Sequence, residues 1–260
     1  SMNSNKALMK CIDNAFKKNK FHQHMVQLIE TTDRSAVTHL LTKNQYIDVI
    51  IPRGGKGLIE KIVSCSKIPT IKHLDGNCHV YIDKTADAKK AFDISINSKT
   101  QRYGACNAME TLLIHKSFPK KHITKILNKY KEIGVEIRGC KNLIKISSDI
   151  ILAKETDWFE EYLSPIIAIK VVDSIDDAIN HIGKYGSLHT DAIIASDKTM
   201  INKFKRLVNS SSVMINTSTR FADGFEYGLG AEIGISTDKL HVRGPVGFEG
   251  LTNLKYIVSS

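Results

Sequence analysis

Apolar residues along this chain occur either in short continuous runs or in stripes spaced three and four residues apart. The main runs, expected to form buried strands, lie at residues 48–51, 78–82, 111–114, 166–172, 191–195 and 213–215. Weaker strand candidates lie at residues 25–29, 69–72, 135–137 and 254–258. The stripes, expected to form helices, lie at residues 5–18, 33–41, 58–63, 88–96, 119–133 and 175–185. Strands that alternate with helices in this way predict an α/β fold with a largely parallel sheet.

Several polar residues mark where these helices begin and end. Asp33 and Asp197 stand where they can cap helices, and Ser174 with Asp177 forms a capping box ahead of residues 175–185. Gly186 follows as a stop signal. We therefore expect a helix between the strands at 166–172 and 191–195.

Composition limits the class of protein. Of the 260 residues, 42% are hydrophobic and 25% are charged, which is typical of a globular domain. No apolar run approaches the roughly 20 residues that span a bilayer, and the first residues lack the apolar core of a signal peptide. The five cysteines include no CxxC pair, which argues against a disulfide framework and against a metal site. We expect a reducing, cytoplasmic setting and no membrane partner.

The formal net charge of +10 raises the question of a nucleic-acid partner. The lysines are spread along the chain with few aromatic residues between them, so we expect no nucleic-acid binding. Small anionic substrates account for the charge more simply.

One cysteine lies in a polar turn between a helical stripe and an apolar run. Cys106 follows Arg102 and Gly104, and a thiol in such a turn can lie near a helix start that favours the thiolate. Lys99 and Arg102 are available to add positive charge. A single cysteine is, however, more often a small buried apolar residue. The residues alone favour this second interpretation.

The segment around Cys106 resembles a known nucleophile segment. Residues 99–102 (Lys-Thr-Gln-Arg) and 106–113 (Cys-Asn-Ala-Met-Glu-Thr-Leu-Leu) are similar to those of the gamma-glutamyl phosphate reductase family, within the aldehyde dehydrogenase superfamily. Blocks at residues 46–55, 217–221, and 228–237 with 240–247 resemble the same family in the same order. The resemblance covers essentially the whole chain after Ser4.

This resemblance implies an aldehyde dehydrogenase-like α/β fold with a partial dinucleotide-binding domain and an α/β catalytic domain. We expect residues 1–83 to be the C-terminal part of the NADP-binding domain and residues 84–249 to be the catalytic domain. Residues 250–260 would supply a C-terminal strand for oligomerisation. Roughly the first third of the family's enzymes precedes the segment where this chain begins, so we expect an N-terminally truncated enzyme without full activity.

The implied activity is the NADPH-dependent reduction of L-glutamate 5-phosphate to L-glutamate 5-semialdehyde and phosphate, a step of proline biosynthesis. Cys106 would be the catalytic nucleophile and would form a thioester. The expected cofactor-binding residues are Arg53, Gly54, Gly55 and Glu161. The expected substrate-binding residues are Arg220, Phe221, Arg102 and Ser218.

The chain departs from the superfamily pattern at three places. His73 stands where many members have a glutamate general base, which favours an acyl-phosphate reductase over a hydrolytic dehydrogenase. Leu163 and Ser164 replace a Phe-Gly pair after Glu161, which leaves its ribose-binding role open. Tyr103 stands where a proline is expected.

Other interpretations remain open at this stage. The chain could be the reductase part of a bifunctional pyrroline-5-carboxylate synthase, or a truncated non-catalytic remnant or basic binding module. A homodimer and an association with glutamate 5-kinase are further possible assemblies.

Overall fold

The computed structural model describes residues 1–260, apart from the side chain of Lys56. The chain divides into two compact units. The first comprises residues 1–50 and 61–69, and the second comprises residues 51–60 and 70–260. In the part of the chain that is described, no helix is both long and apolar enough to cross a bilayer.

The first unit contains short helices and little sheet. Its elements are α1 (Met2–Asn19), the 3-10 helix η1 (Gln23–Met25), α2 (Ser35–Leu40) and the second half of α3 (Lys56–Cys65). The strand predicted at residues 25–29 is absent from the described structure, and segments 48–51 and 69–72 do not form strands. Ile50 N–H donates to the Pro69 carbonyl at 2.9 Å, but no longer ladder forms around this contact. These predictions were wrong because a strand needs a partner of its own length.

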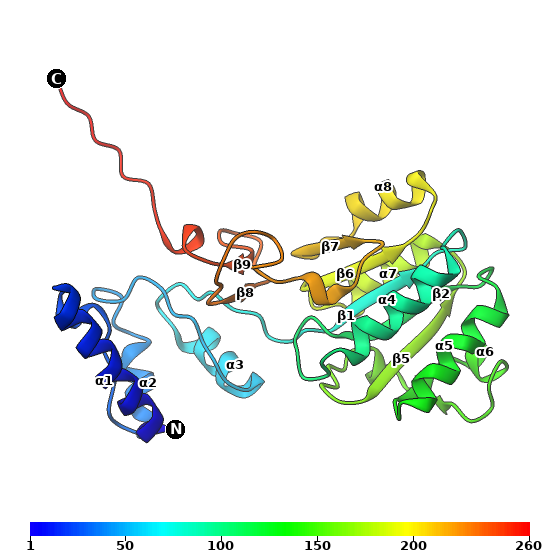
Figure 1. Ribbon diagram of the computed structural model, residues 1–260, viewed down its shortest axis with the longest axis horizontal. Coiled ribbons are helices and arrows are strands. Elements are labelled where there is room, and N and C mark those ends of the chain that lie inside the picture. Colours follow the sequence, from blue (N-terminus) through cyan, green and yellow to red (C-terminus); the bar gives the residue numbers. More distant parts are fainter. The chain divides into compact units, whose positions relative to one another are not determined.

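The second unit is built on a seven-stranded sheet in which every neighbouring pair is parallel (Figure 1). The strand order is β4-β3-β5-β2-β1-β6-β7. The strands are β1 (Cys78–Ile82), β2 (Met109–His115), β3 (Glu136–Gly139), β4 (Ile151–Leu152), β5 (Ile166–Val172), β6 (Thr190–Ile194) and β7 (Ser212–Ile215). The predicted parallel α/β fold is confirmed.

Helices cover both faces of this sheet. They are α4 (Ala88–Thr100), α5 (Lys120–Glu132), α6 (Lys141–Ile144), α7 (Ile175–Tyr185) and α8 (Lys198–Leu207). Val80 and Ile82 of β1 pack in a core with α4, α5 and α6, whereas Tyr81 points into a second core with α7 and α8. This alternation follows from the two-residue period of a strand.

Short elements complete the second unit. The 3-10 helices are η2 (Glu155–Trp158), η3 (Thr219–Phe221) and η4 (Glu249–Leu251). A separate antiparallel pair is formed by β8 (Gly234–Ser236) and β9 (Gly244–Val246). Residues 254–258 form no strand in the described structure, and Leu254 and Val258 are exposed.

The predicted helix boundaries near α7 and α8 are confirmed. Ser174 Oγ accepts from Asp177 N–H at 3.1 Å, and Asp197 Oδ1 accepts from Thr199 N–H at 2.7 Å. Gly186 follows α7 with φ −71°, so the helix ends in an extended rather than a left-handed residue.

The observed division of the chain differs from the boundary predicted at residue 83. β1 lies between β2 and β6 in the seven-stranded sheet, and its five residues are all buried. The seven-stranded sheet therefore begins before residue 83, and β1 is one of its central strands, as its continuous burial on both faces indicates.

A buried ion pair joins the end of α4 to the start of β2. Lys99 Nζ donates to Glu110 Oε2, and both side chains are almost completely inaccessible to solvent. Glu110 Oε1 also accepts from Leu163 N–H at 3.2 Å. The pair closes the loop that carries Cys106, and it connects this loop to the segment before β5.

We predict that Lys99→Met alone lowers the free energy of unfolding by about 3–5 kcal/mol, because it leaves the Glu110 carboxylate buried without its cation. The double variant Lys99→Met/Glu110→Leu should lose much less, since no unpaired charge remains. Urea unfolding of both variants measures the difference. Equal losses in the two variants would contradict this account of the pair.

Candidate active site

Cys106 lies in a tight turn between α4 and β2. Ala108 N–H donates to the Ala105 carbonyl at 2.8 Å, and β2 begins directly afterwards at Met109. The thiol does not lie at a helix start, because α4 ends before the turn and a strand follows it, as the apolar run at residues 111–114 predicts. The turn holds the half-buried Cys106 at the amino end of β2.

Gly76 lies against the backbone of Cys106, and Glu161 accepts a hydrogen bond from Gly76. A Cβ atom at Gly76 would lie 1.9 Å from the Cys106 carbonyl oxygen, so only glycine allows this approach. Gly76 N–H in turn donates to Glu161 Oε1 at 2.8 Å. Glu161, predicted to bind the cofactor, is thus held close to the segment that contacts Cys106.

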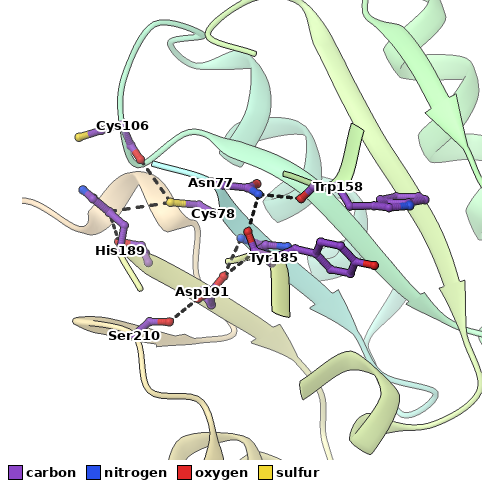
Figure 2. Close-up of polar contacts among 10 residues, drawn as sticks. Asn77, Cys78, Cys106, Trp158, Tyr185, His189, Asp191 and Ser210 are labelled. Carbon is purple, nitrogen blue, oxygen red and sulfur yellow. Dashed lines mark hydrogen bonds and ion pairs between the residues drawn. The ribbon is translucent and has the colours of Figure 1, made fainter. Parts of the chain in front are cut away.

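Two histidines lie beside the thiol. One potential ligand atom from each of His73, Cys106 and His189 lies within 4.8 Å of the other two. Below the turn, Cys78 Sγ donates to the Cys106 carbonyl at 3.3 Å and lies 3.8 Å from His189 Nδ1 (Figure 2). His189 also contacts Thr190 Oγ1 through Nδ1 at 2.9 Å.

Electrostatics around Cys106 oppose ionisation of the free thiol. Burial raises the pKa of Cys106, and the carboxylates of Glu161 and Glu232 add to this effect. Arg220 lowers the pKa in turn. Lys99, expected to supply positive charge, is instead paired with Glu110. The cation that favours the thiolate is therefore Arg220.

The predicted substrate-binding residues lie around η3, which follows β7. Arg220 Nε donates to Gln101 Oε1 at 2.7 Å, next to the loop that carries Cys106. Ser218 is buried, and its Oγ lies 3.0 Å from Ser98 Oγ, so it anchors η3 to α4. Phe221 is 47% exposed. Arg102 is exposed, and its charge lowers the pKa of Arg220, after the larger effect of burial.

Asn107 connects η3 to the nucleophile turn from the other side. Its Nδ2 donates to the Ala222 carbonyl at 3.0 Å. The residue directly after Cys106 therefore fixes the position of the segment that carries Arg220.

The remaining predicted cofactor residues line a small cavity next to His73. Arg53 donates from Nη2 to the Ile233 carbonyl. The cavity has a volume of about 100 Å³, and Arg53, Gly54 and His73 contribute to its wall. A Cβ at Gly54 would meet a Leu58 side-chain atom at 2.7 Å, whereas Gly55 has open space around it. The structure thus brings Glu161 and Arg220 to Cys106, and it places Arg53 in the cavity that His73 also lines.

The sequence analysis missed Gly76, Cys78 and His189. His189 directly precedes β6, and Gly76 and Cys78 lie at the start of β1, so all three occupy the amino ends of strands. Their position directly before apolar runs could have predicted that they lie close together. The amino ends of neighbouring parallel strands lie at the same edge of the sheet.

Known proteins share the sequence family and the fold of this chain. Residues 4–139 match the aldehyde dehydrogenase family. The crystal structure of gamma-glutamyl phosphate reductase from Thermotoga maritima is 42% identical to this chain, with a TM-score of 0.94. That match covers 100% of this chain and 64% of the Thermotoga chain, so the present chain spans less than two thirds of its length.

Two further solved structures share the fold. An acetylating aldehyde dehydrogenase from Geobacillus thermoglucosidasius is 20% identical, with a TM-score of 0.69 and coverage of 97% of this chain and 66% of that one. A glyceraldehyde-3-phosphate dehydrogenase from Methanocaldococcus jannaschii, complexed with NADP, is 17% identical, with a TM-score of 0.63 and coverage of 82% and 55%. Since the family match extends over more than half of its residues, this chain belongs to the aldehyde dehydrogenase family.

Proposed function

We propose that this chain is the catalytic part of a gamma-glutamyl phosphate reductase, which converts L-glutamate 5-phosphate to L-glutamate 5-semialdehyde and phosphate. The observation that carries the proposal is the position of Cys106, which lies between an arginine on η3 and a carboxylate held by Gly76. The similarity to the Thermotoga enzyme supports the substrate class.

In the first step, Cys106 Sγ attacks the acyl carbon of the substrate, and the bond from this carbon to the phosphate oxygen breaks. Phosphate leaves, and a thioester remains on Cys106. The thiol must first lose its proton, because burial raises its pKa. Burial also lowers the pKa of His189 to about 3, so this ring stays neutral at physiological pH. The thiol proton therefore passes to solvent, and Arg220 stabilises the thiolate that remains.

Arg220 is the proposed anion-binding residue in this step. Its guanidinium lies close enough to Cys106 to lower the pKa of the thiol, and it can bind a carboxylate or phosphate through two parallel hydrogen bonds. Ser218 and Gln101 position Arg220, Phe221 lines the approach, and Arg102 adds positive charge.

In the second step, the thioester carbon is reduced and the carbon–sulfur bond breaks, which releases the aldehyde and returns Cys106 to its thiolate. NADPH, when bound, supplies the hydride. The Cys106 backbone N–H is one proposed donor to the developing oxyanion, and such a donor typically contributes about 10²–10³ in rate.

The chain's residues fit one side of this cofactor. Glu161 is held against Gly76 beside the nucleophile, where a carboxylate can accept from a ribose hydroxyl. Arg53, Gly54 and Gly55 would hold phosphate groups, since Arg53 supplies positive charge and Gly55 leaves open space for a close approach. His73 occupies the place of a general base, and the reaction needs no activated water because phosphate is the leaving group.

Location and assembly are further parts of the proposal. All five cysteines are free, which fits a reducing compartment such as the cytoplasm. The exposed apolar residues at 254–258 fit a strand that pairs with a second copy in a homodimer.

The reverse reaction tests the proposed activity. We expect phosphate-dependent reduction of NADP⁺ in the presence of glutamate 5-semialdehyde, and Cys106→Ala should lower the rate by about 10³-fold or more because it removes the nucleophile. Cys11→Ala, which changes an exposed thiol far from the catalytic sheet in the sequence, is the matched control. Equal rates in Cys106→Ala and the unchanged chain would contradict the proposal.

Gly76→Ala tests the close approach of two loops at the nucleophile. The added methyl group must push the Cys106 turn away from the segment before β1, because the carbonyl oxygen it meets belongs to the backbone. We expect Cys106 to become more exposed and to react several-fold faster with iodoacetamide, as followed by peptide mass spectrometry. Gly104→Ala is the control, since a Cβ there meets nothing within 4 Å. An unchanged labelling rate in Gly76→Ala would show that the contact does not hold the turn.

A further inference from the structure

The side chains around Cys106 form a set of soft metal ligands. His73, Cys106 and His189 each present one ligand atom, and the three atoms lie within 4.8 Å of one another. A tetrahedral zinc ion with one sulfur and two nitrogen ligands brings neighbouring ligand atoms to about 3.5 Å. Small rotations of side chains would be enough to close this gap. The half-buried His73 and Cys106 have room for such rotations.

Hydrogen bonds leave the outer nitrogen of each histidine suited to a metal. His73 Nδ1 lies 3.0 Å from the Ile235 carbonyl, which can only accept, so Nδ1 carries the hydrogen and Nε2 carries the lone pair. Metal-binding histidines commonly donate their other nitrogen to a backbone carbonyl in this way.

His189 is buried, and its Nδ1 faces a hydroxyl, which can donate or accept, rather than a carbonyl. Its Nδ1 lies 2.9 Å from Thr190 Oγ1, and its Nε2 is buried with no hydrogen-bond partner in the described structure. The ring is completely buried, and Figure 2 shows its unbonded nitrogen directed to the side where the Cys106 thiol lies. A buried polar atom without a hydrogen-bond partner needs an explanation, and an ion that binds at this atom is one such explanation.

We propose that Cys106, His73 and His189 form a zinc site that traps the nucleophile. Zinc binds the Cys106 sulfur and the two Nε2 atoms, the thiol releases its proton to solvent, and a water molecule takes the fourth position. Binding does not depend on the proposed reaction. Its consequence, reversible inhibition, rests on that function, because a zinc-bound thiolate cannot attack the substrate.

The site is a tertiary one, which explains why cysteine spacing did not reveal it. His73 precedes β1, Cys106 precedes β2 and His189 precedes β6, and these three strands are neighbours in the parallel sheet. Ligands that are distant in the sequence therefore meet at one sheet edge.

Zinc binding to the isolated chain is measured by competition with a chromophoric chelator at pH 7.5. We expect one tight zinc per chain, and Cys106→Ser, His73→Ala and His189→Asn should each weaken binding by more than about 100-fold, since losing a ligand costs more than losing an outer-shell partner. Co²⁺ in place of zinc should give a thiolate-to-metal charge-transfer band that disappears in Cys106→Ser.

The exposed pair His22 and His24 supplies the matched control. Their rings lie 5.3 Å apart, so this pair is the obvious adventitious zinc site, and His22→Ala/His24→Ala should leave the tight site unchanged. Because His189 is buried, its replacement can destabilise the fold, so the thermal unfolding of each variant is compared with that of the unchanged chain. If His189→Asn is unfolded, the half-buried His73→Ala serves as the test in its place. Zinc that binds equally well to His73→Ala and Cys106→Ser, or is lost with the His22/His24 pair, would overturn the proposal.

Binding and inhibition are separated by the same variants. If the chain binds one zinc through Cys106 but shows no turnover, the metal site stands and the proposed reaction fails. If turnover depends on Cys106 but added zinc does not inhibit it, and chelators detect no tight site, the metal site is excluded and the reaction stands.

Discussion

The ion pair between Lys99 and Glu110 is the interaction on which the geometry of the Cys106 loop depends. Its two residues lie at the end of α4 and the start of β2, so the pair fixes both ends of the loop that carries Cys106. Glu110 also accepts from the Leu163 backbone, close in the sequence to Glu161. Two charges that are fully removed from water are costly to separate, and the loop between them is therefore held in one arrangement.

The parallel sheet then determines which side chains meet this loop. Open α/β sheets usually bind their ligands beyond the carboxyl ends of the strands. Here the Cys106 thiol instead precedes β2, and the segments before β1 and β6 supply Gly76 and His189 at the same edge. The missing side chain at Gly76 lets two backbone segments touch, and the chain beyond β7 brings Arg220 to the thiol. The side chains that surround Cys106 are thus brought together by strand order more than by any single motif.

The sequence predicted the sheet well and the contacts around the thiol only in part. Runs such as residues 166–172 are buried on both faces and read as strands without ambiguity, and the cap at Ser174 fixed the start of α7. Residues 25–29 have a similar composition but meet no partner strand in the described structure, and local patterns cannot reveal this. Arg220 was found because its surrounding block resembles a known family. His189 and Gly76 were missed, since their importance arises only from the pairing of distant strands.

Acyl transfer to Cys106 tests the central claim most directly, because this half-reaction needs no cofactor. The chain is incubated with glutaryl phosphate, an acyl phosphate that lacks the amino group through which the glutamyl compound cyclises, and its peptides are analysed by mass spectrometry. The account predicts a hydroxylamine-sensitive acyl group on Cys106, formed faster than on the exposed Cys11 and Cys65 and suppressed in Arg220→Gln. Acylation of Cys106 no faster than that of Cys11 and Cys65 would contradict its assignment as the nucleophile.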